Sequence, residues 1–428
     1  MKRTDTDHHQ HLPTGMKMWE FVTLMAMMMA IPAMSIDMML PALPEIGRDL
    51  YVANPNDRQS VVLFFFLGLA AGSLFYGPLS DRYGRRAILI VTLCFLLAMT
   101  IIAALAPSFP ILIGARMAAG FFAAACRVTV VSIVRDCFRG DAMARIISLI
   151  MMVFIIVPML APSLGYTILL FAPWRFIFWI LAALILLILI WVSMRLPETL
   201  AIENRTSIGA RDLAAIFVRI VSNRNSIGHM LASGLMMAGM VGFVVSVQQI
   251  FYDVFEAPDV FPFAFALMAG GMVVGSMLNS RLVERFGARR MSQTAVILLT
   301  LLSALHCAVI VSGYETLIIF SVIQGLGNLF FAFAGANFSA ISLEPFTKGA
   351  GLASSVQAFL STLVSALLGG VVGAYFDGSP LPIAIGFLTF SVLSLLVIAW
   401  AEGWKLYRRP GLASMREDIA PIGKGPTL

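Results

Sequence analysis

The sequence predicts an all-α polytopic membrane protein of twelve transmembrane helices, arranged as two tandem six-helix bundles. Three observations predict this fold class. Of the 428 residues, 60% are hydrophobic and only 12% are charged. Twelve apolar runs reach the roughly 20 residues that a helix needs to cross a bilayer. A short charged loop sequence recurs in the second half of the chain. A soluble protein of this length would form several domains, each with a charged surface. The chain has too few charges for that, so the composition excludes a soluble enzyme. It also excludes a disordered chain and a disulfide scaffold.

The apolar runs give the elements in order. We expect spans at 19–42, 59–79, 87–106, 109–134, 146–169, 174–195, 226–252, 262–282, 291–312, 315–341, 349–375 and 381–403. The domains are then a tail at 1–18, a first bundle at 19–195, a linker at 196–225, a second bundle at 226–403 and a tail at 404–428. The first span lacks a cleavage site and is too long for a signal peptide, so we expect it to remain as an anchor. The linker is either a short surface helix or an unstructured connection.

The basic residues predict the orientation. With the N-terminus in the cytoplasm, 24 of the 29 Lys and Arg residues fall on the cytoplasmic side, and only Arg48, Arg58 and Arg175 fall outside. Arg116 and Arg127 lie within a span. Because cytoplasmic loops carry the excess of Lys and Arg, we expect both termini in the cytoplasm of a bacterial inner membrane. The net charge of +6 then reflects topology, and no nucleic-acid partner is expected.

The recurring loop indicates the internal repeat. Asp81-Arg-Tyr-Gly84 matches Glu284-Arg-Phe-Gly287 at a constant offset of 203 residues. Each copy joins the second and third span of a six-span half. Such tandem repeats of equal orientation indicate two related bundles.

The first copy of this loop also suggests a conformational latch. Its members are Gly77, Asp81, Arg82, Gly84, Arg85 and Arg86, with Asp136 at the inner end of span 4. The glycines permit a tight turn, and the acids can pair with Arg85. We expect the cluster to hold the halves together on the inside. The alternative is that the arginines are ordinary topology charges, which leaves the acids and glycines unexplained.

Three charges inside spans are candidates for proton coupling and substrate binding. A charge at this depth is costly, so it normally serves a function. Asp37 can carry a proton in one conformation and release it in another, or attract a cation; alternatively it faces water at the helix end. Arg116 either relates to Asp37, directly or through water, or extends to the headgroups. Arg127, deeper in the same span, either lines a cavity or extends to the cytoplasm.

Two further sets of residues are candidates. Pro158, Pro162 and Gly165 predict a kink in span 5, which serves either the transport cycle or packing alone. The cavity candidates are aromatic and amide side chains at membrane depth: Phe65, Phe66, Phe121, Phe122, Gln249, Asn328, Phe331, Asn337 and Gln357. Such surfaces suit a bulky apolar compound, although most of these phenylalanines are equally suited to face lipid or other helices.

The segment Gly77-Pro-Leu-Ser-Asp-Arg-Tyr-Gly-Arg-Arg86 resembles the loop signature of the major facilitator superfamily. Three more segments resemble its bicyclomycin/chloramphenicol-resistance branch of twelve-span drug:proton antiporters: Asp37–Pro44, Arg116–Asp136 and Val157–Gly165. The resemblance implies proton and substrate roles for Asp37, a proton-coupling role for Arg116, and contact of Asp81 with the start of span 11 at Lys348–Gly351. In span 5, two glycines of the family's antiporter motif are replaced.

The sequence therefore predicts a transporter that exports amphipathic drug-like compounds in exchange for protons. The alternatives are a proton-coupled exporter of a sugar or amino acid, and a polytopic membrane enzyme, which would need a catalytic cluster that the loops lack. No ATP-binding motif is present, and neither an organic cofactor nor a metal is expected. His8, His9 and His11 in the polar tail are not expected to bind metal. We expect small amphipathic substrates, protons and lipid as partners, and a monomer.

Overall fold

The computed structural model describes residues 15–138, 140–205, 217–346 and 350–407. Three expectations lie outside these residues: the middle of the linker at 206–216, the Lys348 start of span 11 and the N-terminal histidines.

All regular secondary structure in the described part of the chain is helical. Twelve of these helices are long and apolar enough to cross a membrane. Their cores are α1 (Met18–Asp37), α3 (Ser60–Tyr83), α4 (Arg85–Ala104), α5 (Phe109–Cys137), α6 (Gly140–Leu169), α7 (Arg175–Arg195), α9 (Arg224–Gln249), α10 (Phe261–Phe286), α11 (Ala288–Val311), α12 (Leu317–Leu343), α13 (Ala350–Ala374) and α14 (Leu381–Ala401). Shorter elements are η1 (Leu40–Ala42), α2 (Leu43–Asp49), η2 (Pro55–Gln59), η3 (Ile202–Asn204) and the π-helical η4 (Ile250–Val254). The predicted twelve spans are confirmed.

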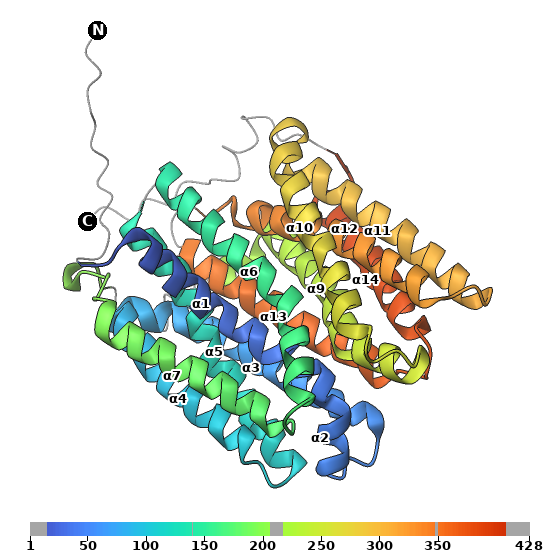
Figure 1. The fold of residues 1–428 in the computed structure, drawn as a ribbon. Coiled ribbons are helices and arrows are strands. Elements are labelled where there is room, and N and C mark those ends of the chain that lie inside the picture. The colour runs from blue at the N-terminus through green and yellow to red at the C-terminus, as the bar shows by residue number, and fades with distance from the viewer. Residues whose placement is uncertain (1–14, 139, 206–216, 347–349, 408–428) are drawn as a thin grey trace.

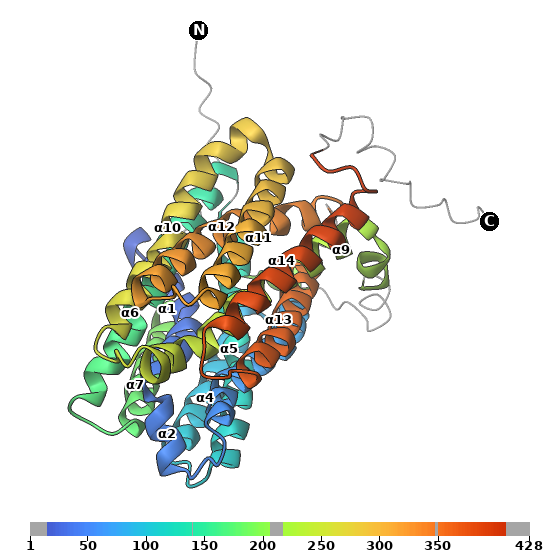
Figure 2. The same cartoon turned by 90° about the vertical axis from the view of Figure 1, so that its right-hand side faces the viewer.

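The helices form two six-helix bundles, coloured blue to green and yellow to red in Figure 1. Packing is densest within each bundle, and α3 on α13 and α6 on α10 join the two. Figure 2 shows the same helices from the side. Glycines permit the closest approaches: a Cβ at Gly68 or Gly120 would collide with the backbone of the facing helix in the α3–α5 pair. Small residues at such contacts are typical of membrane helix packing.

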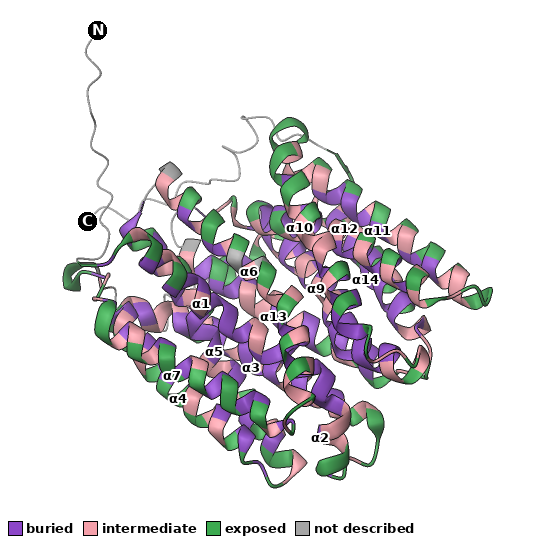
Figure 3. Ribbon diagram, in the orientation of Figure 1, coloured by how far each residue is buried: buried purple, intermediate pink, exposed green. Residues whose placement is uncertain are grey.

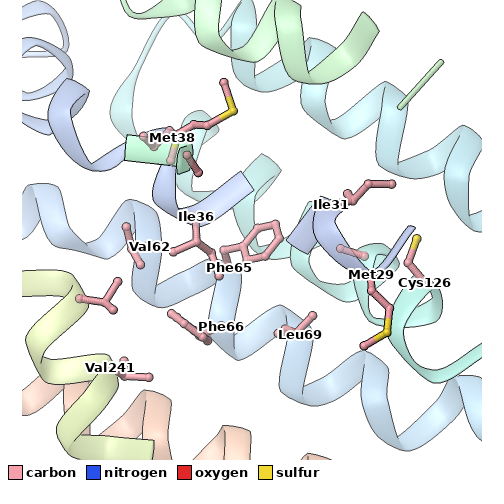
Figure 4. Close-up of a cluster of buried hydrophobic side chains, with 14 of the residues drawn as sticks. Met29, Ile31, Ile36, Met38, Val62, Phe65, Phe66, Leu69, Cys126 and Val241 are labelled. Atoms are coloured by element: carbon pink, nitrogen blue, oxygen red, sulfur yellow. The ribbon is translucent and has the colours of Figure 1, made fainter. Parts of the chain in front are cut away.

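Burial follows the expected division between the interior and the lipid-facing surface. Figure 3 shows buried residues along the inner faces of the helices and exposed residues along the outer faces. Large apolar side chains such as Leu267, Leu301 and Ile318 are mostly exposed, as lipid-facing residues would be. A buried cluster includes Ile36 of α1, Phe65 of α3 and Val241 of α9 (Figure 4), so apolar packing joins the halves near the middle.

The two ends of the molecule differ in character. We call the end with the α3–α4 and α10–α11 turns the basic end, since it holds most of the described Arg residues. The opposite end carries α2, η1, η2 and η4 (Figure 1).

Candidate functional site

Asp37 ends α1 in the interior of the molecule. Its side chain is buried, with 6% of the residue exposed. The carboxylate makes no hydrogen bond or ion pair with any described residue. The chain then turns through η1, which contains Pro41. A buried acid without a fixed partner is able to exchange a proton or receive a ligand as its surroundings change.

Arg116 lies on α5 and joins two neighbouring helices. Its guanidinium donates from Nη2 to the Ser35 carbonyl of α1 at 2.8 Å and from Nε to the Val61 carbonyl of α3 at 3.3 Å. The ring centre of Phe65 lies 4.3 Å from its central carbon. Arg116 is only 2% exposed, so it does not extend to the headgroups. It forms no direct ion pair with Asp37, although Ser35 is two residues away.

Arg127 lies eleven residues, about three turns, beyond Arg116 and therefore on nearly the same face of α5. In contrast to Arg116, it is exposed. No described residue forms an ion pair with it. The inward face of α5 is thus closed around Arg116 and accessible at Arg127, which is nearer the basic end.

The predicted loop cluster forms around Arg85, which is almost completely buried. Its Nη1 lies 2.6 Å from Asp81 and its Nε lies 3.0 Å from Asp136. Nη1 also donates to the Ser80 hydroxyl at 2.7 Å. Arg86 donates to the Ser193 carbonyl at 2.7 Å. These bonds connect α3, α4, α5 and α7 of the first bundle.

Sequence reasoning missed Glu198, just after α7. Its carboxylate accepts the backbone N–H groups of Arg85 at 2.9 Å and Arg86 at 3.3 Å, and so caps the start of α4. Gly84 has a φ of 100°, and a Cβ there would collide with the Glu198 carboxylate. The signal in the sequence was the first acid of the linker, three residues after the end of the sixth predicted span.

The second bundle has a related cluster. Arg289 donates to Glu402 at 2.8 Å and to Glu344 at 2.9 Å. Gly287 has a φ of 84°, but a Cβ there would meet no atom within 4 Å. The repeat therefore preserves the turn and an Arg–acid cluster, while the partners differ.

Among the described residues, the charged members of the loop cluster form no ion pair with the second bundle. These ion pairs lie within the first bundle, and the expected latch between the halves stays a prediction. Contact between bundles at this level includes Gly77, where a Cβ would collide with the Ser355 hydroxyl of α13. Arg82 is exposed and lies 5.2 Å from the ring centre of Tyr83. The expected contact of Asp81 with the start of span 11 at Lys348–Gly351 stays a prediction, since residues 348 and 349 lie outside the described residues.

A second polar network, which sequence reasoning missed, closes the opposite end. Gln59 donates to Gln249, and Gln249 donates to Asn56 at 3.1 Å. Asn56 in turn donates to the Phe376 carbonyl at 2.9 Å. Arg58 pairs with Asp253 at 3.0 Å. Tyr166 donates to Asp259. We call these contacts the cross-bundle seal.

The seal includes Gln249, one of the cavity candidates. It is buried between the bundles and bonds to Gln59 and Asn56. The other amides make contacts between helices: Asn328 donates to the Met268 carbonyl at 3.0 Å, Asn337 to Asn279 at 2.8 Å, and Gln357 to Ser339 at 2.6 Å. These bonds fit helix packing.

The aromatic candidates divide into three groups. Phe65 and Phe66 are buried in the apolar cluster between the bundles (Figure 4). Phe121 lies 6.1 Å from Phe75 and Phe122 lies 4.9 Å from Phe95, ring centre to ring centre. Phe75 and Phe95 are half-exposed on the outer surface, so these rings pack on the lipid-facing side. Phe331 is partly buried.

Span 5 is one continuous helix, α6, with Pro158 and Pro162 inside it. A Cβ at Gly165 would collide with the Met38 carbonyl of the neighbouring segment. Gly165 thus allows α6 to pack closely against the chain just after Asp37, so α6 contacts the candidate site directly.

The chain has relatives of similar length. It is 28% identical to the uncharacterized MFS-type transporter YdgK of Bacillus subtilis, over 85% of this chain and 90% of the relative. It is 28% identical to a bicyclomycin resistance protein homolog of Haemophilus influenzae, over 83% and 89%. It is also 28% identical to the multidrug resistance protein MdtL of Escherichia coli, over 87% and 93%. The resemblance to the drug-resistance branch is confirmed.

Solved structures share the fold. The human organic anion transporter MFSD10 superimposes with a TM-score of 0.67 at 17% identity, covering 90% of this chain and all of that one. A D-xylose-proton symporter gives 0.69 at 12% identity, covering 90% and 99%. The Major Facilitator Superfamily model matches residues 21–270. Together with the twelve spans and the repeated loop, this match shows that the chain belongs to the Major Facilitator Superfamily of membrane transporters.

Proposed function

We propose that this transporter exports amphipathic drug-like compounds from the cytoplasm in exchange for protons, by alternating access. The family supports small-molecule transport across an inner membrane, and the relatives named for bicyclomycin and multidrug resistance support drug efflux. The orientation rests on the basic end, which we assign to the cytoplasm. We propose that the protein acts as a monomer.

One observation carries the coupling: Asp37 is a buried carboxylate with no partner among the described residues. A proton neutralises this carboxylate, whereas a cationic ligand pairs with its ionised form. Binding of one therefore weakens binding of the other. Competition between proton and substrate at one group is sufficient for exchange. Arg116 positions this end of α1 through its bond to the Ser35 carbonyl.

Two sets of contacts support alternating access. The cross-bundle seal closes the end opposite the basic loops, while Arg127 is exposed on the inward face of α5. We assign this conformation to the stage at which substrate enters from the cytoplasm. The Arg85 cluster keeps the first bundle rigid, so the two bundles can rock about each other as units.

The test is proton-driven efflux of a fluorescent cationic dye in inverted membrane vesicles. Asp37→Asn keeps the shape of the side chain and removes its charge, so pH-dependent efflux should disappear. Asp49→Asn is the matched control, because Asp49 is partly exposed and pairs with Arg175 at the opposite end. Intact pH-dependent efflux in Asp37→Asn would refute the coupling role, and failure of every dye to move would refute drug export.

A further inference from the structure

A pocket of about 260 Å³ opens at the end opposite the basic loops. Both bundles contribute to its walls. They consist of Pro41, Pro44, Glu45 and Arg48 from the segment after α1, Tyr166, Leu169 and Leu170 from the end of α6, and Tyr252, Pro258 and Asp259 from the second bundle. The pocket lies beside the cross-bundle seal, since Tyr166 and Asp259 belong to both.

The chemistry of the walls suits an organic cation. Glu45 accepts one hydrogen bond, from the Trp174 backbone N–H at 3.3 Å, and Asp259 accepts one from the Tyr166 hydroxyl. The second oxygen of each carboxylate has no hydrogen bond with a described residue. Tyrosine rings, proline and leucine side chains and Arg48 form the remaining walls, so the two carboxylates exceed the single basic group. Aromatic faces together with carboxylates are the usual environment of ammonium ligands.

The charge of this end favours the same class of ligand. The described residues that connect the spans here include eight acids and three arginines. The acids are Glu45, Asp49, Asp57, Asp253, Glu256, Asp259, Glu315 and Asp377, and the arginines are Arg48, Arg58 and Arg175. An excess of acids around a concave site raises the local concentration of cations.

Two unpartnered polar groups lie just inward of the pocket. Asp37 is one helical turn before Pro41, and Gln248 is one turn before Tyr252. Gln248 is fully buried, and neither atom of its amide has a hydrogen-bond partner. A buried amide without partners is costly. The two bundles thus each bring a free polar group to the layer between the pocket and the interior.

We propose that this pocket is a binding site for a small amphipathic organic cation that arrives from the side opposite the basic loops. Because the walls come from both bundles, a bound cation holds the bundles together and stabilises the closed state of this end. The exported compound, once released, is one source of such a cation. Binding itself does not depend on the proposed export function; only its effect on transport does.

The test measures binding of benzyltrimethylammonium to the purified full-length protein by calorimetry, with toluenesulfonate as an anion of similar size. The cation should bind and the anion should not. Asp259→Asn keeps an acceptor for Tyr166, and Glu45→Gln keeps one for Trp174, so both should fold. Each should weaken cation binding by about three- to fivefold. Asp377→Asn, an acid of the same end outside the pocket, should leave the affinity unchanged.

Three results would overturn the proposal: equal binding of the anion, unchanged affinity in both pocket variants, or an equal loss in Asp377→Asn. The anion comparison uses the unaltered protein, so it remains decisive if a variant is unstable. Absence of export together with selective cation binding would refute the proposed function and leave this site in place. A spin-label distance between positions 51 and 314 should also report a larger closed fraction when benzyltrimethylammonium is bound.

Discussion

The cross-bundle seal makes a quantitative prediction about Gln249. This residue is 1% exposed, accepts a hydrogen bond from Gln59 and donates one to Asn56. Gln249→Leu removes both bonds and leaves the buried Gln59 amide without its partner. This loss raises the free energy of the closed state alone, because water forms hydrogen bonds with these groups once the end opens.

The magnitude follows from the typical cost of a buried, unsatisfied polar group, about 1–3 kcal/mol. A central value of about 2 kcal/mol shifts the equilibrium roughly 30-fold toward opening of this end. The Arg58–Asp253 pair should matter less. Its side chains are 13% and 44% exposed, and such pairs contribute about 0.2–1 kcal/mol. We therefore expect Arg58→Ala to shift the equilibrium by less than about fivefold.

The assay is double electron–electron resonance on protein in lipid nanodiscs, with spin labels at Tyr51→Cys and Tyr314→Cys in a background without the four native cysteines. Both tyrosines are exposed, one in each bundle. Gln248→Leu is the matched control, since the Gln248 amide has no partner to lose. Unchanged distances in Gln249→Leu would refute the reasoning, as would a larger opening in Arg58→Ala.

Three further predictions concern the first bundle. Gly84→Ala should lower the thermal midpoint more than Gly287→Ala, because both have positive φ but only Gly84 faces a carboxylate, that of Glu198; equal losses in a melting assay would contradict this. Arg116→Lys should cost about 1–3 kcal/mol of stability, because one ammonium cannot maintain both backbone bonds of the planar guanidinium; an unchanged melting point would contradict it. Arg127→Cys should react with an impermeant thiol reagent in inverted vesicles and Arg116→Cys should not; equal labelling would contradict the difference in exposure.

The fold could be predicted from the sequence because membrane helices have a strong local signal. Twelve apolar runs of sufficient length, and the match of Asp81-Arg-Tyr-Gly84 to its second copy, already imply the arrangement of helices. The Arg85 partners were predictable for a related reason: Asp81 is one helical turn away, and Asp136 ends a span on the same side.

Contacts between distant segments were not predictable in this way. Gln59 and Gln249 are 190 residues apart, and nothing in either span marks them as partners. Glu198 follows α7 and caps α4 only because the first bundle folds back on itself. Asn337 and Gln357 looked like cavity residues, since a polar residue at membrane depth either binds a ligand or bonds to another helix; their helix contacts fit the second role.

The most direct test of the central claim is substrate-induced proton release from the purified protein. Addition of a transported cationic dye at constant pH should release protons from the unaltered protein and from Asp49→Asn, and should release none from Asp37→Asn although the variant remains folded. Equal proton release from Asp37→Asn would show that another group carries the proton, and would contradict the assignment of coupling to Asp37.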